Sequence, residues 1–200
     1  ISFEEGAMIE PLACVLYGVK RLKPEYGSRA IIFGAGPMGL LLLKALKTGG
    51  ISRLAVVDID GECLERAKAL GATDVYGSAA EAKEEFPRGF DVVVDATGNP
   101  KVIGAMFTVA AKRARILQFG CADSSAEVTI SPYQIYDNDW EYIGTRTAVY
   151  TYTQAIDMIS SGKISVKDII SECVPMERLA DYLENGKPSG SLKIVLCPQK

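Results

Sequence analysis

Residues 30–47, AIIFGAGPMGLLLLKALK, decide the fold, because they contain an apolar strand, a glycine-rich turn and a helix in direct succession. The first four residues form a short apolar run that is typical of a buried strand. Gly34, Gly36 and Gly39 follow with the spacing G-x-G-x-x-G. This order predicts a cradle for the phosphate groups of a nucleotide.

Each residue type in this turn has a physical reason. Gly34 lets the chain turn sharply, Gly36 has no Cβ to hold a pyrophosphate away, and Gly39 lets the helix pack closely on the strand. Pro37 suits the first helical turn, because its φ is fixed and the helix would not bond its missing N–H internally. The remaining free amides then face the anion, with the positive end of the helix dipole behind them.

A glycine turn of this kind also occurs for packing alone, so the next strand matters. Residues 54–57 form a second apolar run, and Asp58 follows it, nineteen residues after Gly39. An acid at this place can accept both hydroxyls of an adenosine ribose. Strand, turn, helix, strand and acid in this order predict a dinucleotide site. The alternative is that Asp58 only caps the following helix.

The composition indicates one main domain with an appendage. The 200 residues are 48% hydrophobic and 24% charged, and the net charge of −3 gives no electrostatic reason to expect nucleic acid or an anionic membrane. The small basic cluster Lys112, Arg113 and Arg115 is interpreted as a solvated turn before a strand. No apolar run approaches the length of a membrane span and no signal-peptide pattern is present, so a cytoplasmic location is expected.

The five cysteines lie far apart in the sequence and form no C-x-x-C pair: Cys14, Cys63, Cys121, Cys173 and Cys197. The spacing therefore predicts neither a structural zinc site nor a disulfide framework, and buried free thiols are expected. Histidine is absent, which removes the commonest metal ligand and the commonest general base. The chain begins at Ile1 without a methionine, which is consistent with a part excised from a longer protein.

The rest of the chain alternates between helical and strand patterns. Helices are expected over 1–23, 63–70, 79–85 and 100–111, and further strands over 72–76, 90–96, 114–119 and 140–145. Asn99 can cap the helix that Pro100 begins. This rhythm predicts an α/β fold with a doubly wound, parallel, six-stranded Rossmann sheet. The last fifty residues break the rhythm and predict an appendage with helices over 152–161 and 176–184 and strands over 169–174 and 192–196.

Six stretches together resemble the zinc-type medium-chain dehydrogenases, above all their polyol (sorbitol-like) and threonine dehydrogenase branch. They are EPLACVLYGV, IIFGAGPMGLLLLKAL, VVDID, ERAKALGATDVY, FDVVVDATG and SLKIVL. The resemblance covers essentially all 200 residues but only the later part of that family. It implies a connecting helix over 1–24, a dinucleotide-binding Rossmann domain over 25–150, and a segment over 151–200 that returns to an amino-terminal catalytic domain missing from this chain.

The resemblance implies an oxidoreductase that moves a hydride between a secondary alcohol and NAD. Family members hold a catalytic zinc with a cysteine and a His-Glu pair from the missing domain, so no catalytic residue is assigned here and the chain alone is expected to be inactive. Glu10 matches the acid that lies at or beside the zinc in polyol dehydrogenases. It is the one candidate metal residue, and the alternative is a helix-start acid placed favourably on the dipole.

The resemblance also implies a row of cofactor contacts. It assigns the pyrophosphate to Gly34, Gly36, Pro37 and Met38 beside Gly39, the adenosine ribose to Asp58, the adenine pocket to Thr97, and the nicotinamide to Phe119 and Gly120, with Gly144 to Thr147 closing its side. Two positions depart from the family pattern. Cys63 replaces a frequent arginine near the adenine end, and Arg146 stands one place early, so it is as readily a surface salt-bridge residue.

Two other functions remain open from the sequence. A zinc-free, NADPH-dependent quinone or enone reductase of the same superfamily would generally lack the acid of the E-P pair, so Glu10 and Asp58 count against it. A non-catalytic NAD-binding module would need only the cradle. The expected partners are a small alcohol or polyol and a second copy of the chain, which would pair through the exposed edge of the strand over 140–145, and not nucleic acid or a membrane.

Overall fold

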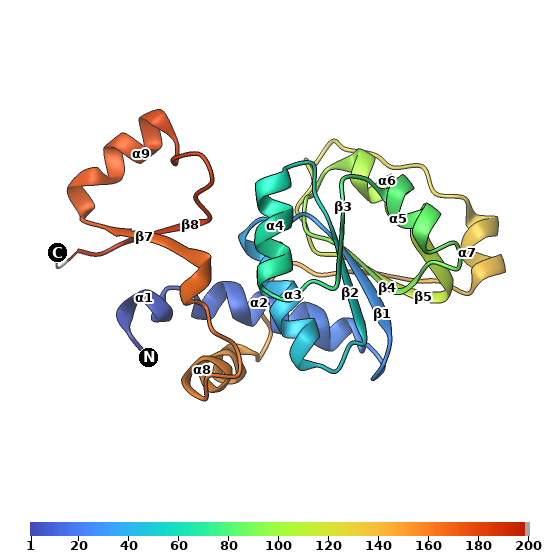
Figure 1. The fold of residues 1–200 in the computed structure, drawn as a ribbon, viewed down its shortest axis with the longest axis horizontal. Coiled ribbons are helices and arrows are strands. Elements are labelled where there is room, and N and C mark those ends of the chain that lie inside the picture. The colour runs from blue at the N-terminus through green and yellow to red at the C-terminus, as the bar shows by residue number, and fades with distance from the viewer. Residues whose placement is uncertain (199–200) are drawn as a thin grey trace.

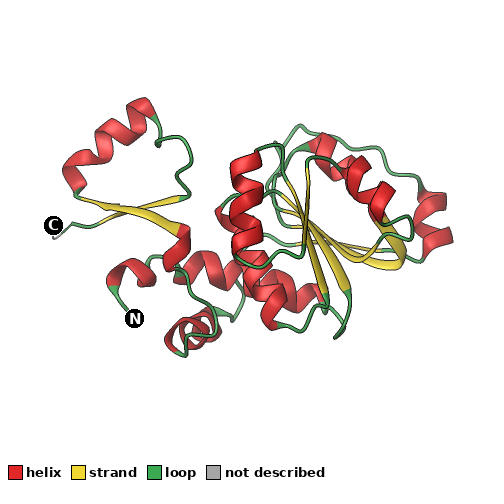
Figure 2. Ribbon diagram, in the orientation of Figure 1, coloured by secondary structure: helices red, strands yellow, loops and turns green. Residues whose placement is uncertain are grey.

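The computed structural model describes residues 1–198, in which a parallel sheet lies between two layers of helices (Figures 1 and 2). Its strands are β1 (Arg29–Phe33), β2 (Arg53–Val57), β3 (Asp74–Tyr76), β4 (Phe90–Asp95), β5 (Ala110–Gln118) and β6 (Glu141–Gly144). They are ordered β3-β2-β1-β4-β5-β6 and every pair is parallel. The predicted doubly wound Rossmann sheet is confirmed, with β6 at its edge.

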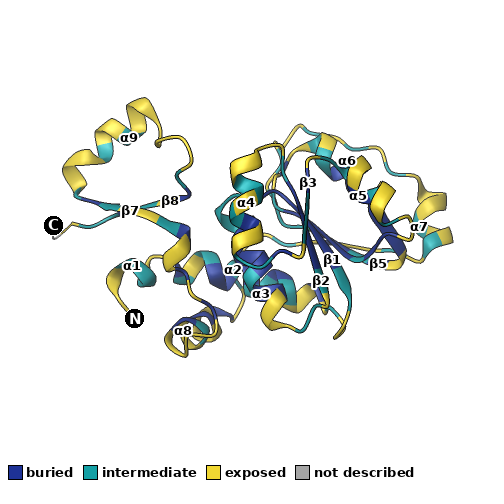
Figure 3. Ribbon diagram, viewed as in Figure 1, coloured by how far each residue is buried: buried dark blue, intermediate teal, exposed yellow. Residues whose placement is uncertain are grey.

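Helices cover both faces of this sheet, and further helices lie away from it near the two ends of the chain (Figure 1). They are α1 (Phe3–Gly6), α2 (Ile9–Leu22), α3 (Pro37–Thr48), α4 (Gly61–Ala69), α5 (Ala79–Glu85), α6 (Pro100–Val109), α7 (Pro132–Asn138), α8 (Tyr152–Ser160) and α9 (Leu179–Asn185). Two 3₁₀ turns, η1 (Lys167–Ile169) and η2 (Met176–Arg178), lie in the last part of the chain. Buried side chains concentrate in the sheet and on the helix faces that pack against it (Figure 3).

Alternation along the strands divides the core into two clusters. Ile32 belongs to a cluster with α2, α3 and α8, whereas the neighbouring Ile31 belongs to a cluster with α5 and α6. Successive side chains of a strand point to opposite faces, so a strand covered on both faces must be apolar throughout. Val92, Val93 and Val94 of β4 are buried for this reason, as their continuous run predicts.

Several element boundaries differ from the predicted ones. The helix expected over 1–23 is two helices, α1 and α2, separated by a turn at Ala7 and Met8, and a capping box of Ser2 and Glu5 begins the first of them. The helix expected to reach residue 111 ends at Val109, where the chain passes directly into β5. Helix α7 had no counterpart among the predicted elements.

The interpretation of the basic cluster as a turn before a strand is wrong, because Lys112, Arg113 and Arg115 lie within β5. Arg113 has a φ of 62°, close to a register shift in the pairing of β4 with β5. The Arg115 guanidinium donates to the Leu22 carbonyl and pairs with Glu141 of the edge strand. The charges therefore help to hold β6 in place.

The end of the chain forms the expected helix and strand appendage. Helix α8 packs on α2, where the fully buried Thr151 hydroxyl donates to the Ala13 carbonyl at 2.7 Å. Strands β7 (Ile170–Val174) and β8 (Lys193–Leu196) form a separate parallel pair, which lies near α1 and away from the large sheet (Figure 1). Within residues 1–198, no helix is long and apolar enough to cross a membrane.

An ion pair fastens the edge strand β3 to β2. Arg53 donates two hydrogen bonds of 2.7 Å to the Asp74 carboxylate. Burial raises the pKa of Asp74, but the hydrogen bonds from Arg53 and Thr73 and the Arg53 charge outweigh it, so the pKa lies below its ordinary 3.8. A carboxyl with a lowered folded-state pKa stabilises the fold above its unfolded pKa, and this contribution is lost as the pH falls through the folded value.

Asp74→Asn is therefore expected to lower the free energy of unfolding by about 1 kcal/mol at neutral pH and by much less near pH 3. Urea unfolding of the parent and the variant at both pH values measures the difference. Asp181→Asn is the matched control, since the pair of Asp181 with Arg178 is exposed on both sides and should contribute little. An equal loss at both pH values would show that the charge of Asp74 is not responsible.

Candidate dinucleotide-binding site

The chain leaves β1 through a turn that requires glycine at its first position. Gly34 has a φ of 100°, a conformation that side chains rarely adopt, and its N–H donates to the Val57 carbonyl at 2.8 Å. A Cβ at Gly34 would lie 3.0 Å from the Thr97 Cγ2 atom. Gly34 therefore joins the ends of β1, β2 and β4 in one tight turn.

Gly39 and Gly36 differ in what the protein itself requires. A Cβ at Gly39 would lie 1.8 Å from the Gly34 carbonyl oxygen, so the close approach of α3 to the turn needs glycine. A Cβ at Gly36 would meet nothing within 4 Å, and the backbone there has φ −71° and ψ −177°, which any residue adopts. Packing within residues 1–198 gives no reason for glycine at position 36. A ligand that approaches the backbone closely would give one.

The start of α3 offers free amide donors at the same place. Gly36 is its N-cap residue, no side chain caps the helix, and Pro37 occupies the first turn. The N–H groups of Met38 and Gly39 therefore have no capping side chain, and the positive end of the dipole of a 12-residue helix lies behind them. Together these features form the kind of helix start that binds phosphate groups.

Asp58 lies at the end of β2 and is oriented by the backbone. Its Oδ2 accepts a hydrogen bond from the Ala35 N–H at 2.7 Å, and its Oδ1 accepts one from the Asp60 N–H at 3.0 Å. The N-cap of α4 is Asp60, whose carboxylate accepts from the Glu62 N–H at 2.8 Å. Capping α4 is thus the role of Asp60. Each Asp58 oxygen retains a lone pair for a further donor.

A cavity of about 500 Å³ opens between the carboxyl ends of the strands and α6. Its lining combines apolar side chains with a few polar ones: Phe33, Gly34, Val57, Asp58, Ile59, Gly77, Ser78, Ala79, Thr97, Asn99, Lys101, Val102 and Ala105. Three of the predicted site residues, Gly34, Asp58 and Thr97, come together here. The crevice outside the carboxyl ends of the strands is where open α/β sheets bind ligands, and the volume suits a nucleotide half.

The wall beneath Thr97 is held by a buried acid that the sequence analysis did not single out. Asp95 is fully buried at the end of β4, and its Oδ1 accepts from the Thr97 N–H at 2.9 Å and from the Thr97 hydroxyl at 2.6 Å. Its Oδ2 accepts from the Gly98 N–H at 3.0 Å. The signal that could have found it is an acid directly after the apolar run of β4.

The residues assigned to the nicotinamide lie further along the same edge and do not line this cavity. Phe119 and Gly120 follow β5, and both of their N–H groups donate to the Asp95 carbonyl at 3.0 Å. A Cβ at Gly120 would lie 2.2 Å from the Gly98 nitrogen, so packing alone requires glycine there. Gly144 ends the exposed strand β6, and a Cβ would meet nothing. The Thr145 Oγ1 beside it is buried, with no hydrogen-bond partner in residues 1–198.

Glu10 lies exposed in the first turn of α2. Its carboxylate accepts a hydrogen bond from the Cys14 thiol at 3.2 Å. Burial, then the hydrogen bond and charge of Glu10, raise the pKa of Cys14 above its ordinary 9.0, which keeps the thiol protonated at neutral pH. Within residues 1–198, Glu10 belongs to no group of three metal-ligating side chains, so zinc at Glu10 would need ligands from outside this part of the chain.

The cysteines are free thiols, as expected, but the expectation that they are buried is wrong. Four of the cysteines are half-buried, and Cys121 is exposed. The fold also brings Cys173 and Cys197 close to Glu4, which their distance in the sequence concealed.

The strand order, the glycine turn and the cavity define a Rossmann domain. The chain belongs to the zinc-binding dehydrogenase family, whose characteristic sequence pattern matches residues 37–161.

Similar proteins agree with this assignment. D-arabinitol dehydrogenase 1 of Uromyces fabae is 28% identical over 207 residues, which are 99% of this chain and 59% of that protein. Sorbitol dehydrogenase of Bacillus subtilis (strain 168) is 28% identical over 208 residues, 100% of this chain and 59% of that protein. A crystal structure of a candidate zinc-binding dehydrogenase from Sinorhizobium meliloti 1021, bound to NADP, has a TM-score of 0.92 at 24% identity, over 97% of this chain and 59% of that one. The chain thus spans about three fifths of the length of the curated relatives it matches.

Proposed function

We propose that this chain is the cofactor-binding part of a zinc-dependent alcohol or polyol dehydrogenase that transfers a hydride between a secondary alcohol and NAD. The observation that carries the proposal is Gly36, which lies at the uncapped start of α3. A Cβ there would meet no described protein atom within 4 Å, so packing does not explain the glycine. The chain's membership of the zinc-binding dehydrogenase family supports hydride transfer as the reaction class. Its likeness to arabinitol and sorbitol dehydrogenases supports an alcohol or polyol as the substrate class.

The residues of this chain bind and orient the cofactor, whose nicotinamide ring supplies the hydride chemistry when bound. The amides of Met38 and Gly39 would donate hydrogen bonds to the pyrophosphate, and the Asp58 carboxylate would accept hydrogen bonds from the hydroxyls of the adenosine ribose. The cavity beside Thr97 takes the adenine. Phe119, Gly120 and Gly144, with the residues up to Thr147, border the nicotinamide, and the unpaired Thr145 hydroxyl offers that end a polar contact.

Glu10 is proposed as a zinc-proximal acid in the intact protein. A carboxylate suits zinc either as a ligand or as the partner of a bound water. The Glu10 carboxylate accepts a hydrogen bond from the Cys14 thiol through one of its oxygens. A carboxylate can accept several hydrogen bonds, so Glu10 can also accept one from a zinc-bound water. The remaining zinc ligands and the proton relay would come from residues outside this chain, which has no histidine.

The purified chain is expected to bind NAD weakly and to show no dehydrogenase turnover. It keeps the cradle, but Glu10 is the only zinc-site residue proposed for the reaction in this chain, and no imidazole is present to move the alcohol proton. Calorimetric titration with NAD measures the binding, and the absorbance of NADH with sorbitol or arabinitol and added zinc measures turnover. Failure to bind NAD at millimolar concentration would contradict the proposed function. Zinc-dependent polyol oxidation by the chain alone would contradict the proposal that the remaining zinc ligands and the proton relay come from outside this chain.

We also propose that two copies of the chain pair along the edge of the large sheet. β6 is an edge strand, and an edge strand offers unpaired backbone groups to a partner. Tyr142 on this strand is 40% exposed, so its side chain is available for the same contact. Small-angle scattering well above micromolar concentration should fit a dimer. Tyr142→Lys should shift the equilibrium toward monomer, and Tyr26→Lys, at a side chain 90% exposed outside any strand, should not. Scattering that fits only a monomer in the parent would contradict this interface.

A further inference from the structure

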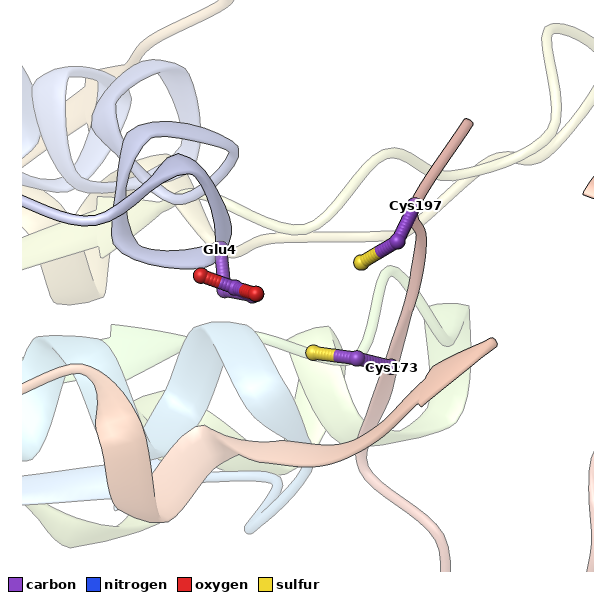
Figure 4. Close-up of side chains that lie close together, drawn as sticks. All are labelled: Glu4, Cys173 and Cys197. Atoms are coloured by element: carbon purple, nitrogen blue, oxygen red, sulfur yellow. The ribbon is translucent and has the colours of Figure 1, made fainter. Parts of the chain in front are cut away.

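Three potential metal ligands converge at the end of the molecule that carries α1 and the small sheet. One carboxylate oxygen of Glu4 and the sulfur atoms of Cys173 and Cys197 all lie within 4.8 Å of one another. Figure 4 shows the three side chains pointing toward a common centre from α1, β7 and the segment after β8. We propose that this group binds a divalent transition metal ion of the zinc type, independently of the function proposed above.

The backbone of the small sheet places both thiols on one face. Cys173 pairs in register with Val195 of β8, and Cys197 lies two residues after Val195, just past the end of that strand. Side chains two residues apart on a strand share a face, and so do paired residues of parallel strands. The Cys197 N–H donates to the Val174 carbonyl at 2.7 Å and continues the ladder past the end of β8. The two sulfur atoms are therefore held by regular pairing rather than by a loose tail.

Helix α1 is oriented so that Glu4 faces these thiols. The adjacent Glu5 is used within the capping box, where its carboxylate accepts from the Ser2 N–H at 2.8 Å, and it also pairs with Lys167 at 3.7 Å. In the same capping box, the Ser2 hydroxyl oxygen accepts a hydrogen bond from the Glu5 N–H at 3.2 Å. These contacts fix the helix on both sides of Glu4, so its carboxylate is directed at the small sheet (Figure 4).

The donor set selects the kind of ion. Two thiolates with one carboxylate are ligands that zinc accepts, whereas magnesium and calcium prefer oxygen alone and copper(I) prefers sulfur alone. With bonds of about 2.0–2.3 Å, ligand atoms around a tetrahedral ion lie roughly 3.3–3.8 Å apart, so the three groups need to close only slightly. All three residues are half-buried, which leaves the ion accessible but partly desolvated.

A cavity of about 510 Å³ opens beside the group and provides the fourth position. Phe3, Glu4, Ala7, Val195 and Cys197 are among the residues that line it. Water in this cavity can complete a tetrahedral shell, since zinc sites with three protein ligands keep one open position. The cavity also gives the ion a path of entry.

A disulfide between the two cysteines fits the backbone less well. An offset of two residues across a pair of parallel strands places the Cα atoms about 8 Å apart. Disulfides form without backbone movement only below about 7 Å.

The experiment is a cobalt titration of the reduced, chelator-treated chain. One Co²⁺ per chain should produce a thiolate-to-cobalt charge-transfer band, Zn²⁺ should displace it, and Zn²⁺ alone should raise the melting temperature. Cys173→Ser and Cys197→Ser should each weaken binding by more than about tenfold and diminish the band. Glu4→Gln should weaken binding but keep the band. Cys121→Ser and Cys14→Ser should bind as the parent does.

Four results would overturn the proposal, three of them from the parent chain and the cysteine variants. The first is a parent chain that shows neither the band nor a higher melting temperature with Zn²⁺. The second is a band that survives Cys173→Ser and Cys197→Ser but disappears with Cys14→Ser, which would place the ion at Glu10. The third is loss of two thiols to a disulfide, detected by mass and thiol titration, in place of metal binding. Glu4→Gln keeps the test decisive if a cysteine variant fails to fold, because binding equal to that of the parent would also overturn the site.

Discussion

Gly36→Ala is expected to weaken the binding of NAD by about a hundredfold while it lowers the melting temperature by less than about 2 °C. The protein itself has room for the new methyl group, because a Cβ at Gly36 would meet nothing within 4 Å. The backbone conformation there also suits any residue. A pyrophosphate would then be held away from the amides of Met38 and Gly39, and each lost charge-assisted hydrogen bond costs roughly 1.5–3 kcal/mol.

Gly39→Ala is the contrasting variant of the same turn. Its Cβ would lie 1.8 Å from the Gly34 carbonyl oxygen, so α3 must move and stability should fall by about 1–3 kcal/mol or more. Calorimetric titration with NAD and thermal unfolding of both variants separate the two effects. If Gly36→Ala bound NAD as tightly as the parent, the start of α3 would not be the phosphate site. If it unfolded as readily as Gly39→Ala, the glycine would serve the fold.

The sequence predicted correctly those parts of the fold that depend on residue types and spacings within a few positions of one another. The run of Val92 to Val94 can only be buried on both faces, and the spacing from Gly34 to Gly39 sets a strand directly before a helix. Asn99 caps α6 as expected, accepting from the Lys101 N–H at 3.0 Å. Such features depend on neighbours within a few residues, which the sequence displays directly.

The features that were missed depend on pairing between distant segments. Helix α6 ends at Val109 because β5 must begin there to reach β4, and the apolar pattern alone does not contain that constraint. Lys101 becomes part of the cavity only once α6 packs beside the sheet. Cys173 and Cys197 meet because β7 and β8 pair in parallel, a contact that no spacing rule for neighbouring cysteines covers.

The second large effect concerns Asp58 and the choice between NAD and NADP. The parent chain is expected to bind NAD about tenfold to a few hundredfold more tightly than NADP, because a 2′-phosphate would meet the Asp58 carboxylate in place of a hydroxyl. Ile59 follows Asp58, 98% exposed, where an arginine could have compensated the phosphate charge. NADP in the Sinorhizobium meliloti structure does not decide the matter, since at 24% identity that likeness extends to the fold alone.

The electrostatic surroundings of Asp58 support this preference. Burial is the largest cause that raises the pKa of the Cys63 thiol above its ordinary 9.0, and the negative charges of Asp58 and Asp60 raise it further. Asp60 caps α4 and does not line the cavity, so Asp58 is the acid that faces the ribose. Lys101 lines the same cavity and is the cation that could favour a 2′-phosphate.

Asp58→Asn is expected to bring the affinities for NAD and NADP to within about tenfold of each other, by weakening NAD and relieving the repulsion of the phosphate. The amide oxygen can still accept from the Ala35 N–H, so the turn is retained, whereas Asp58→Gly should narrow the gap at a cost in stability. Asp60→Asn is the matched control, because asparagine caps a helix as well as aspartate does and the residue lies outside the cavity. Lys101→Ala should weaken NADP more than NAD. Calorimetric titration measures the affinities of the parent and the variants for NAD and NADP. If the parent bound both cofactors equally, or bound NADP more tightly, Asp58 would not be the ribose residue. An unchanged ratio of the two affinities in Asp58→Asn would lead to the same conclusion.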